Sequence, residues 1–232
     1  MFLSQLILNP RDRQVRFDSA RPYEMHRTLL NGGFDGIPKA DIGRVLFRVD
    51  VDRFGGSPVV LVQSEREPAW GHLPAEYLRE EAKCKPLELV VVAGQRLRFR
   101  LRANPTKRVA AKNERLGSLM VGKRVGLLTE ADQIAWLIRK GVEGGFTIPG
   151  EWVPATHPEG GGSVRLPNFR VDAIPEGRDR NDKAGHTAGA FVAVRYEGVL
   201  KVTDSARFIA TVHAGVGSAK GYGYGLLSVG PA

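Results

Sequence analysis

The segment Gly215-Val-Gly-Ser-Ala-Lys-Gly-Tyr-Gly-Tyr-Gly225 guides the interpretation of the whole chain. It holds five glycines in eleven residues. Glycine enters left-handed conformations and lets the backbone come close to a ligand. Neighbouring free N–H groups in such a loop form a concavity of anion size. We therefore predict a surface loop that binds phosphate. The residues assigned to this site are Gly217, Lys220, Gly221, Gly223 and Gly225.

The glycine-rich segment does not fit the common nucleotide-binding loops. A dinucleotide fingerprint opens a helix within a strand–helix–strand unit, and only seven residues follow Gly225. The P-loop pattern, which ends in Gly-Lys-Ser or Gly-Lys-Thr, is absent from the sequence. A bulged turn before a last strand remains the alternative to a phosphate site.

Composition narrows the class of protein. The chain has 232 residues and 42% hydrophobic content, which suits one large or two small packed domains. The net charge of +9 favours a polyanionic partner such as nucleic acid. No apolar run reaches membrane length. Cys84 is the single cysteine and the histidines lack metal-ligand spacing, so we predict no metal and no cofactor. A cytoplasmic protein without membrane contact is the expectation.

The first half of the chain predicts one ferredoxin-like module. Its expected elements are a strand at 3–9, a basic loop at 11–16, a helix from Pro22 to Gly32, strands at 44–52 and 59–62, a helix within 73–82 and a strand at 95–103. Proline at the first helical turn and glycines at the end are typical helix boundaries. The order β-α-β-β-α-β is that of a ferredoxin-like module, which we place at residues 1–115.

The second half repeats this theme. After a basic linker at 104–124, its expected elements are a helix at 129–142, strands at 146–153 and 164–173, a strand pair or one long strand at 190–202, a helix at 205–213 and a final strand. Polar loops are expected at 154–162 and 175–189. We therefore predict an α+β fold of two tandem ferredoxin-like (RRM-like) domains, the second at residues 116–232.

The first predicted helix displays groups for acid–base chemistry. At 3.6 residues per turn, Tyr23, His26 and Arg27 share one face. RNA can be cleaved when its 2′-hydroxyl attacks the adjacent phosphorus, which needs a base, an acid and a cation for the developing charge. His26 fits the base or the acid, Tyr23 can position a hydroxyl, and Arg27 can hold the phosphate. A surface histidine beside a surface arginine is the alternative.

A second pattern indicates a track for a nucleic-acid backbone. In the segment Arg96-Leu-Arg-Phe-Arg-Leu-Arg102, strict alternation puts every arginine on one face of a strand. Adjacent cations repel each other, so a phosphate partner is favoured over a solvated basic face. The RNA-binding residues predicted from this region are Arg98, Arg100, Arg102, Lys107, Arg108, Lys123 and Arg124.

Four stretches together resemble the CasE family, the CRISPR repeat-processing endoribonucleases of the type I-E Cascade complex. They are Leu6-Ile-Leu-Asn-Pro10, Pro22-Tyr-Glu-Met-His-Arg-Thr-Leu29, Gly94-Gln-Arg-Leu-Arg-Phe-Arg-Leu-Arg-Ala-Asn-Pro105 and Gly215–Val229, in the order found in the family. The resemblance spans nearly the whole chain. It implies two ferredoxin-like domains in tandem, binding of the repeat RNA hairpin, and a place beside other Cascade subunits.

The resemblance also implies a mechanism and a site. The family cleaves at the 3′ side of the hairpin without metal, leaving a 2′,3′-cyclic phosphate and a 5′-hydroxyl. Its catalytic histidine and helix tyrosine match His26 and Tyr23. A basic hairpin in the second domain corresponds to 170–183, with Arg178, Arg180 and Lys183 as its cations.

One position departs from the resemblance. Related nucleases often carry a lysine near the active helix, where this chain has Asn31, so a third catalytic cation is Arg27 or a residue from elsewhere. Whether His26 acts as base or acid stays open. A non-catalytic RNA-binding subunit of the same fold and a basic structural protein of a ribonucleoprotein particle are the alternatives.

Overall fold

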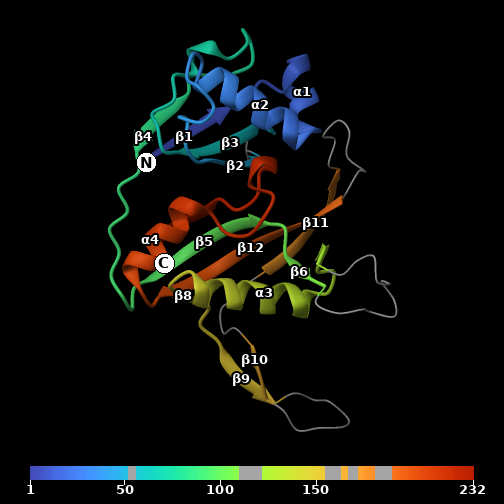
Figure 1. Ribbon diagram of the computed structural model, residues 1–232, viewed down its shortest axis with the longest axis vertical. Helices are drawn as coiled ribbons and strands as arrows, with labels where there is room; N and C mark the ends of the chain where they lie inside the picture. The colour runs from blue at the N-terminus through green and yellow to red at the C-terminus, as the bar shows by residue number, and fades with distance from the viewer. Residues whose placement is uncertain (52–55, 110–121, 155–162, 167–171, 181–189) are drawn as a thin grey trace.

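A computed structural model of the chain describes residues 1–51, 56–109, 122–154, 163–166, 172–180 and 190–232. The described residues form two main antiparallel β-sheets, each covered on one face by two α-helices (Figure 1), and two short hairpins. The two units share one strand order, in which the first strand of each unit lies between its third and fourth strands. This is the order of a ferredoxin-like module, so the fold is α+β with two such domains in tandem, as the sequence predicted.

The first sheet has the strand order β2-β3-β1-β4, and its pairs are all antiparallel. Its strands are β1 (Phe2–Ile7), β2 (Val45–Val51), β3 (Pro58–Ser64) and β4 (Lys83–Pro86). Helices α1 (Arg13–Ser19) and α2 (Pro22–Gly33) follow β1. Met25 and Leu29 of α2 are fully buried against Leu6 and Val60 of the sheet. This face forms the core of the first domain.

Three expectations for this domain were wrong. The basic segment expected as a loop is α1, because the Asp12 side chain accepts a hydrogen bond from the backbone N–H of Val15 and caps a helix. No helix forms at 73–82, where a single 3₁₀ turn, η1 (Trp70–His72), precedes irregular chain. The fourth strand is β4, whose residues are all exposed and therefore carry no alternating pattern.

The second sheet has the strand order β11-β12-β5-β13, with β8 beside β12. Its strands are β5 (Arg96–Ala103), β8 (Phe146–Thr147), β11 (Asp172–Arg180), β12 (Ala190–Val202) and β13 (Leu227–Pro231). Helices α3 (Glu130–Glu143) and α4 (Ser205–Ala214) lie where the sequence predicted them. Each begins at a side-chain cap, because Thr129 and Asp204 each accept a hydrogen bond from a backbone N–H of the first turn.

The arginine-rich strand β5 belongs to this second sheet, where it pairs with both β12 and β13. The expectation that it completes the first module was wrong. Alternation predicts a strand and its buried face, but the strands with which it pairs are decided by contacts with residues far away in the sequence. A division of the chain by sheets therefore falls between Pro86 and Arg96, and not between residues 115 and 116.

Other segments of the second domain also differ from expectation. The region from Pro175 onward, expected as a loop, remains in β11 as far as Arg180, with a register shift between Pro175 and Gly177. A bulge lets a strand tolerate proline and glycine, which obscured the pattern. Two hairpins are added to the module: β6 (Thr106–Arg108) with β7 (Arg124–Gly126), and β9 (Glu151–Pro154) with β10 (Ser163–Leu166).

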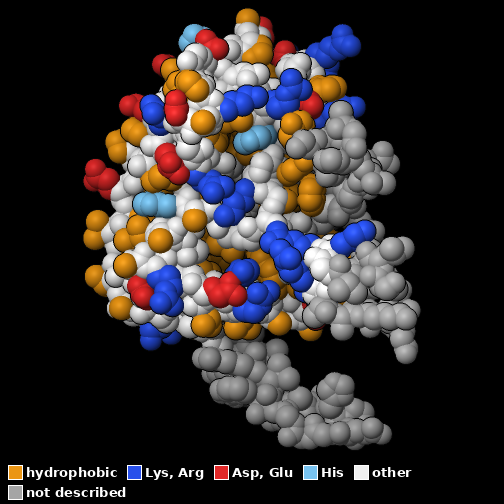
Figure 2. Space-filling model, viewed as in Figure 1, with side chains coloured by type: hydrophobic (Ala, Val, Ile, Leu, Met, Phe, Trp, Pro, Cys, Tyr) orange, Lys and Arg blue, Asp and Glu red, His pale blue; other side chains and the backbone are white. Residues whose placement is uncertain are grey.

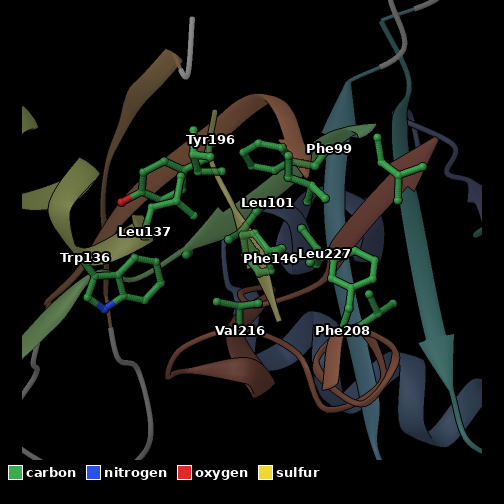
Figure 3. Packing of buried hydrophobic residues seen from close by; sticks show 14 of the residues in the cluster. Phe99, Leu101, Trp136, Leu137, Phe146, Tyr196, Phe208, Val216 and Leu227 are labelled. Atoms are coloured by element: carbon green, nitrogen blue, oxygen red, sulfur yellow. The ribbon is translucent and has the colours of Figure 1, made fainter. Parts of the chain in front are cut away.

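The core of the second domain lies between its sheet and its helices (Figure 3). Leu97, Phe99 and Leu101 of β5 are buried there, as the alternation predicted. The rings of Trp136 and Tyr196 stack with centroids 6.0 Å apart. The arginines of β5 consequently point to the opposite face of the sheet.

A buried guanidinium joins the two sheets. Arg48 of β2 is only 2% exposed and donates to both carboxylate oxygens of Asp50 at 3.1 and 3.0 Å. It also donates to the backbone oxygen of Arg100 in β5 at 3.3 Å and to Ser228 Oγ in β13 at 2.9 Å. Arg48 thus connects the edge strand of the first sheet to two strands of the second.

A buried amide makes a second connection. Gln63 of β3 is 1% exposed, and its Nε2 donates to the backbone oxygens of Val212 and His213 at 2.9 and 3.3 Å. These carbonyls lie in the last turn of α4, where backbone oxygens have no N–H donor within the helix. Leu46, the cross-strand partner of Gln63, lies beside Gly215, which follows α4. The face of the first sheet that its helices leave uncovered is therefore seated on the second domain.

Arg48→Met is expected to lower the free energy of unfolding by about 3 kcal/mol, because Asp50 loses its buried partner and keeps Arg100 at 3.7 Å. Arg139→Met is the matched control, since the Arg139–Glu143 pair is 53% and 50% exposed and such pairs contribute about 0–1 kcal/mol. Urea denaturation measures both. Equal losses in the two variants would show that Arg48 does not hold the domains together.

Candidate active site

Helix α2 presents His26 at the boundary between the two domains. Pro22 opens the helix at a position where a missing N–H has no cost. Met25 and Leu29 anchor it in the first core, which turns His26 toward the second domain. The imidazole ring stacks on Phe47 of β2, with centroids 6.0 Å apart and planes 13° apart. The predicted catalytic histidine is thus anchored on α2, with its ring packed against the edge strand β2.

The surroundings of His26 disfavour the protonated form of its imidazole. Nδ1 is buried and has no hydrogen-bond partner among the described residues. Burial lowers the pKa of His26 below its ordinary value of 6.5, because the charged form loses hydration. A β-carbon built on Gly221 would lie 3.5 Å from Nε2, so the glycine backbone passes closely over the ring. A neutral imidazole at neutral pH is the form that accepts a proton.

His26 opens into a cavity of about 250 Å³ that contains three cationic side chains. The lining residues are His26, Leu30, Lys39, Ile42, Gly43, Arg44, Val45, Lys220 and Gly221. Among the described residues, no acidic side chain belongs to this lining, and the cations come from two domains. The cavity can therefore attract an anionic group to the imidazole.

Lys220 is the half-buried cation of this cavity. It begins the 3₁₀ turn η3 (Lys220–Tyr222), which lies against α2 and β2. Its Nζ donates to the backbone oxygen of Ala214, at the end of α4, over 2.6 Å. Burial, with the charges of Arg44 and Lys140, lowers the pKa of Lys220. The sequence assigned Lys220 to phosphate binding, and the structure brings it beside His26.

Tyr23 lies one helical turn before His26, next to an aromatic cluster. Its ring centroid is 5.7 Å from that of Tyr222. Phe191 of β12 lies 4.7 Å from Tyr222 and 6.0 Å from Tyr224, measured between ring centroids. Tyr23 is absent from the lining of the His26 cavity. Its predicted catalytic role stays a prediction.

Arg27 points to a different neighbour. Its guanidinium pairs with Glu24 at 2.9 Å, its side chain is 58% exposed, and it does not line the His26 cavity. Lys39, Arg44 and Lys220 do line it. The sequence left the third catalytic cation as Arg27 or another residue. These three side chains can supply it in place of Arg27. No sequence spacing pointed to Lys39 or Arg44, because both lie in chain that only tertiary folding brings to α2.

The glycine-rich segment is packed rather than open. Gly223 and Gly225 are buried, so the expectation of a surface loop was wrong for them. At Gly223, with φ +77°, an added β-carbon would meet the Phe47 ring at 3.1 Å. At Gly225, with φ +90°, it would meet the backbone oxygen of Val216 at 2.8 Å. Gly217 and Gly221 are half-buried and line cavities, so phosphate contact at these two stays a prediction.

A larger basic groove of about 750 Å³ adjoins the His26 cavity through Lys220, which lines both. The groove brings together Lys107, Arg108, Arg124 and Gly217, for which RNA contact stays a prediction. Arg139 and Lys140 of α3, which sequence reasoning missed, also line the groove, but both pair with Glu143 of the same lining. Figure 2 shows Lys and Arg side chains across the middle of this face, over α3 and the glycine-rich segment.

The arginines of β5 face carboxylates. Arg100 pairs with Glu197 at 2.8 Å and Arg102 with Glu176 at 2.7 Å. The Arg102 guanidinium also lies 4.5 Å from the centroid of the Tyr224 ring. Arg98 is exposed and lines a separate groove of about 610 Å³ with Arg100. A phosphate at Arg100 or Arg102 would have to displace a carboxylate, which the sequence did not reveal because the partners are far away in the chain.

The remaining predicted cations lie apart from His26 or outside the described residues. Lys123 is exposed and directly precedes β7. The backbones of Arg178 and Arg180 pair in β11 with Val192 and Ala190. Lys183 lies outside the described residues. RNA contact by these four stays a prediction.

The described residues offer neither a metal-binding cluster nor a membrane-spanning helix. Among them, no group of three or more His, Cys, Asp and Glu side chains is arranged to hold a metal ion. None of the helices described is long and apolar enough to cross a membrane.

Comparison with known proteins identifies relatives over the whole chain. The model of a family described as CRISPR associated protein matches residues 1–231. CRISPR-associated endoribonuclease Cse3 of Thermus thermophilus is 41% identical over 238 residues, covering 100% of both chains. The Cascade subunit CasE of Escherichia coli is 32% identical over 233 residues, again covering 100% of both.

A solved structure agrees with these sequence matches. CRISPR endoribonuclease Cse3 bound to a 19-nucleotide RNA superimposes with a TM-score of 0.76 at 39% identity, covering 100% of both chains. The agreement extends over both ferredoxin-like domains, because no part of either chain is left out. This chain therefore belongs to the CRISPR-associated protein family, and within that family to the CasE group.

Proposed function

We propose that this chain is an endoribonuclease that binds the hairpin of a CRISPR repeat RNA and cleaves the precursor at the 3′ side of that hairpin. The observation that carries the proposal is the cavity in which His26 meets Lys39, Arg44 and Lys220. A neutral imidazole surrounded by cations is suited to an anionic substrate that must lose a proton. RNA is such a substrate, because its 2′-hydroxyl lies beside a phosphate.

The proposed reaction is an internal transfer. His26 takes the proton of the 2′-hydroxyl, the 2′-oxygen attacks the neighbouring phosphorus, and the 5′-oxygen of the next nucleotide leaves. The products are a 2′,3′-cyclic phosphate and a 5′-hydroxyl. The cations stabilise the charge that grows on the phosphorane oxygens, where preorganised groups are most effective. Tyr23 would position the reacting nucleotide from the neighbouring turn of α2.

No step in this route requires a metal ion, since the base and the cations are side chains of the protein. Lysine and arginine at the cavity supply the positive charge that a divalent cation supplies in other nucleases. We therefore propose metal-independent cleavage. The lowered pKa of His26 supports the base role, because the imidazole is then unprotonated at neutral pH.

The basic groove gives the substrate a path to the cavity. Lys220 lines both, so a strand held by Lys107, Arg108 and Arg124 would continue to His26. Phosphate contacts of this kind position a nucleic acid without reading its sequence. The RNA in the related solved structure supports the choice of RNA as ligand.

The relative from Escherichia coli, named a Cascade subunit, supports a place for this chain in such an assembly. We propose that the chain remains with the processed guide RNA and contacts other Cascade subunits. Guide RNA is made and used in the cytoplasm, so we place the chain there. A non-catalytic RNA-binding subunit is the alternative that an inactive protein would support.

The direct test incubates the purified protein with repeat RNA from the CRISPR array of the same genome in excess EDTA. We expect a single cut that leaves a cyclic phosphate. RNA with a 2′-deoxy residue at the scissile nucleotide is expected to bind and to remain uncut, because the attacking oxygen is missing. Cleavage of the deoxy substrate at the normal rate would rule out internal attack. Binding without any cleavage would support the non-catalytic alternative.

His26→Ala is expected to slow cleavage by about 10²–10⁴-fold, the usual contribution of a general acid or base. Hairpin binding should change little, since the cations remain. Single-turnover rates and a binding isotherm for the same sample measure the two effects separately. Normal cleavage by the variant would remove His26 from the mechanism.

Gly221→Ala and Gly223→Ala are expected to fail in different ways. The methyl group at position 221 would fit at ordinary contact distance but would lie 3.5 Å from His26 Nε2, so cleavage should fall while the melting temperature holds. At position 223 the left-handed backbone and the Phe47 ring at 3.1 Å oppose a side chain, so melting should fall. Full activity of Gly221→Ala would place the reacting atoms elsewhere.

A further inference from the structure

Lys220 is the side chain that links the two cavities beside the active helix. It lines both the His26 cavity and the larger basic groove. The next residue, Gly221, brings its backbone against the His26 ring. The backbone beside Lys220 is therefore held close to the imidazole, and the bond from its Nζ to Ala214 orients the side chain.

The proposed reaction needs a second proton transfer that His26 cannot supply while it acts as the base. When the bond from phosphorus to the 5′-oxygen breaks, that oxygen leaves as an alkoxide and must be protonated. Three cations line the cavity. The guanidinium of Arg44 does not give up a proton in proteins, and Lys39 is exposed. Lys220 is half-buried and held in place by Ala214.

We propose that Lys220 is the general acid of the cleavage reaction, and that its ammonium group protonates the leaving 5′-oxygen. This inference rests on the proposed endoribonuclease function. It adds a catalytic group from the second domain to the histidine of the first, so that base and acid come from opposite sides of the domain boundary.

The atoms of this step balance. The proton of the 2′-hydroxyl goes to His26 as the bond from the 2′-oxygen to phosphorus forms. The bond from phosphorus to the 5′-oxygen breaks, its electron pair stays on oxygen, and one proton of the Lys220 ammonium joins that oxygen. His26 ends protonated and Lys220 neutral. Proton exchange with water restores both groups, so no further reactant is consumed.

The surroundings of Lys220 suit an acid. An ammonium carries three N–H donors, and Ala214 accepts one of them at 2.6 Å, which orients the group and leaves others for the substrate. Burial and the charges of Arg44 and Lys140 also weaken its hold on the proton, as the lowered pKa indicates. A lysine whose pKa lies nearer to neutral pH transfers its proton more readily.

The test compares two substrates that differ at a single atom. After the cut has been mapped, the same repeat RNA is made with sulfur in place of the leaving 5′-oxygen. A thiolate is a much weaker base than an alkoxide and leaves without a proton. A group that acts only as the acid therefore becomes dispensable on the sulfur substrate, whereas the base is still needed.

Lys220→Arg is the decisive variant, because it keeps the positive charge and a donor for Ala214 but loses the transferable proton. We expect it to bind the hairpin normally, to cut ordinary RNA about 10²–10⁴-fold more slowly, and to cut the sulfur substrate within about threefold of the wild-type rate. His26→Ala is expected to stay slow on both substrates.

Lys39→Met is the matched control, since it removes another lysine from the lining of the same cavity. Its ratio of sulfur to oxygen cleavage rates should equal that of the wild type. Both rates are measured on the same protein sample, so partial unfolding lowers them by the same factor and leaves the ratio unchanged. Lys220→Met can therefore replace Lys220→Arg if the arginine variant melts at a lower temperature.

Two outcomes would overturn the proposal. If Lys220→Arg cuts ordinary RNA at the wild-type rate, Lys220 supplies charge and no proton. If it is equally slow on both substrates, Lys220 positions the RNA without acting as the acid. Both outcomes leave wild-type cleavage intact. Failure of the wild type to cut either substrate would instead refute the endoribonuclease function itself.

Discussion

The active site depends on the Phe47 ring, which is held between His26 and the glycine-rich segment. One side of the ring stacks on the imidazole, and the backbone of Gly223 approaches it so closely that a β-carbon would lie at 3.1 Å. Phe47 sits on β2, the edge strand of the first sheet. The C-terminal segment must therefore pass around this edge before Gly221 and Lys220 can reach α2, and glycine is the residue that allows so close a passage.

The same edge strand couples catalysis to the joining of the two domains. Arg48, the neighbour of Phe47, points to the other face of β2 and bonds to β5 and β13 of the second sheet. Gln63 adds bonds to the end of α4, close to the Ala214 carbonyl that orients Lys220. A shift between the domains would move His26 and Lys220 relative to each other, so the seating of one sheet on the other is also the alignment of the site.

The basic charge of the chain divides into two groups with different tasks. On β5, Arg100 and Arg102 are paired with Glu197 and Glu176, so neighbouring carboxylates largely neutralise their charge. Around the groove, Lys107, Arg108 and Arg124 are exposed, and Lys220 joins this groove to the cavity of His26. Density of arginine in a sequence thus overestimates a nucleic-acid track, because distant carboxylates can fold onto it.

The sequence by itself determined what depends on local pattern. The alternation of β5, the helices α3 and α4 and the position of His26 on α2 were all predicted, because each follows from a few neighbouring residues. Only the tertiary structure decided that β5 joins the second sheet, that Gly223 and Gly225 are packed, and that Lys220 meets His26. These facts depend on pairings between residues that are far apart in the chain, and no local spacing encodes which distant surface will fill a gap.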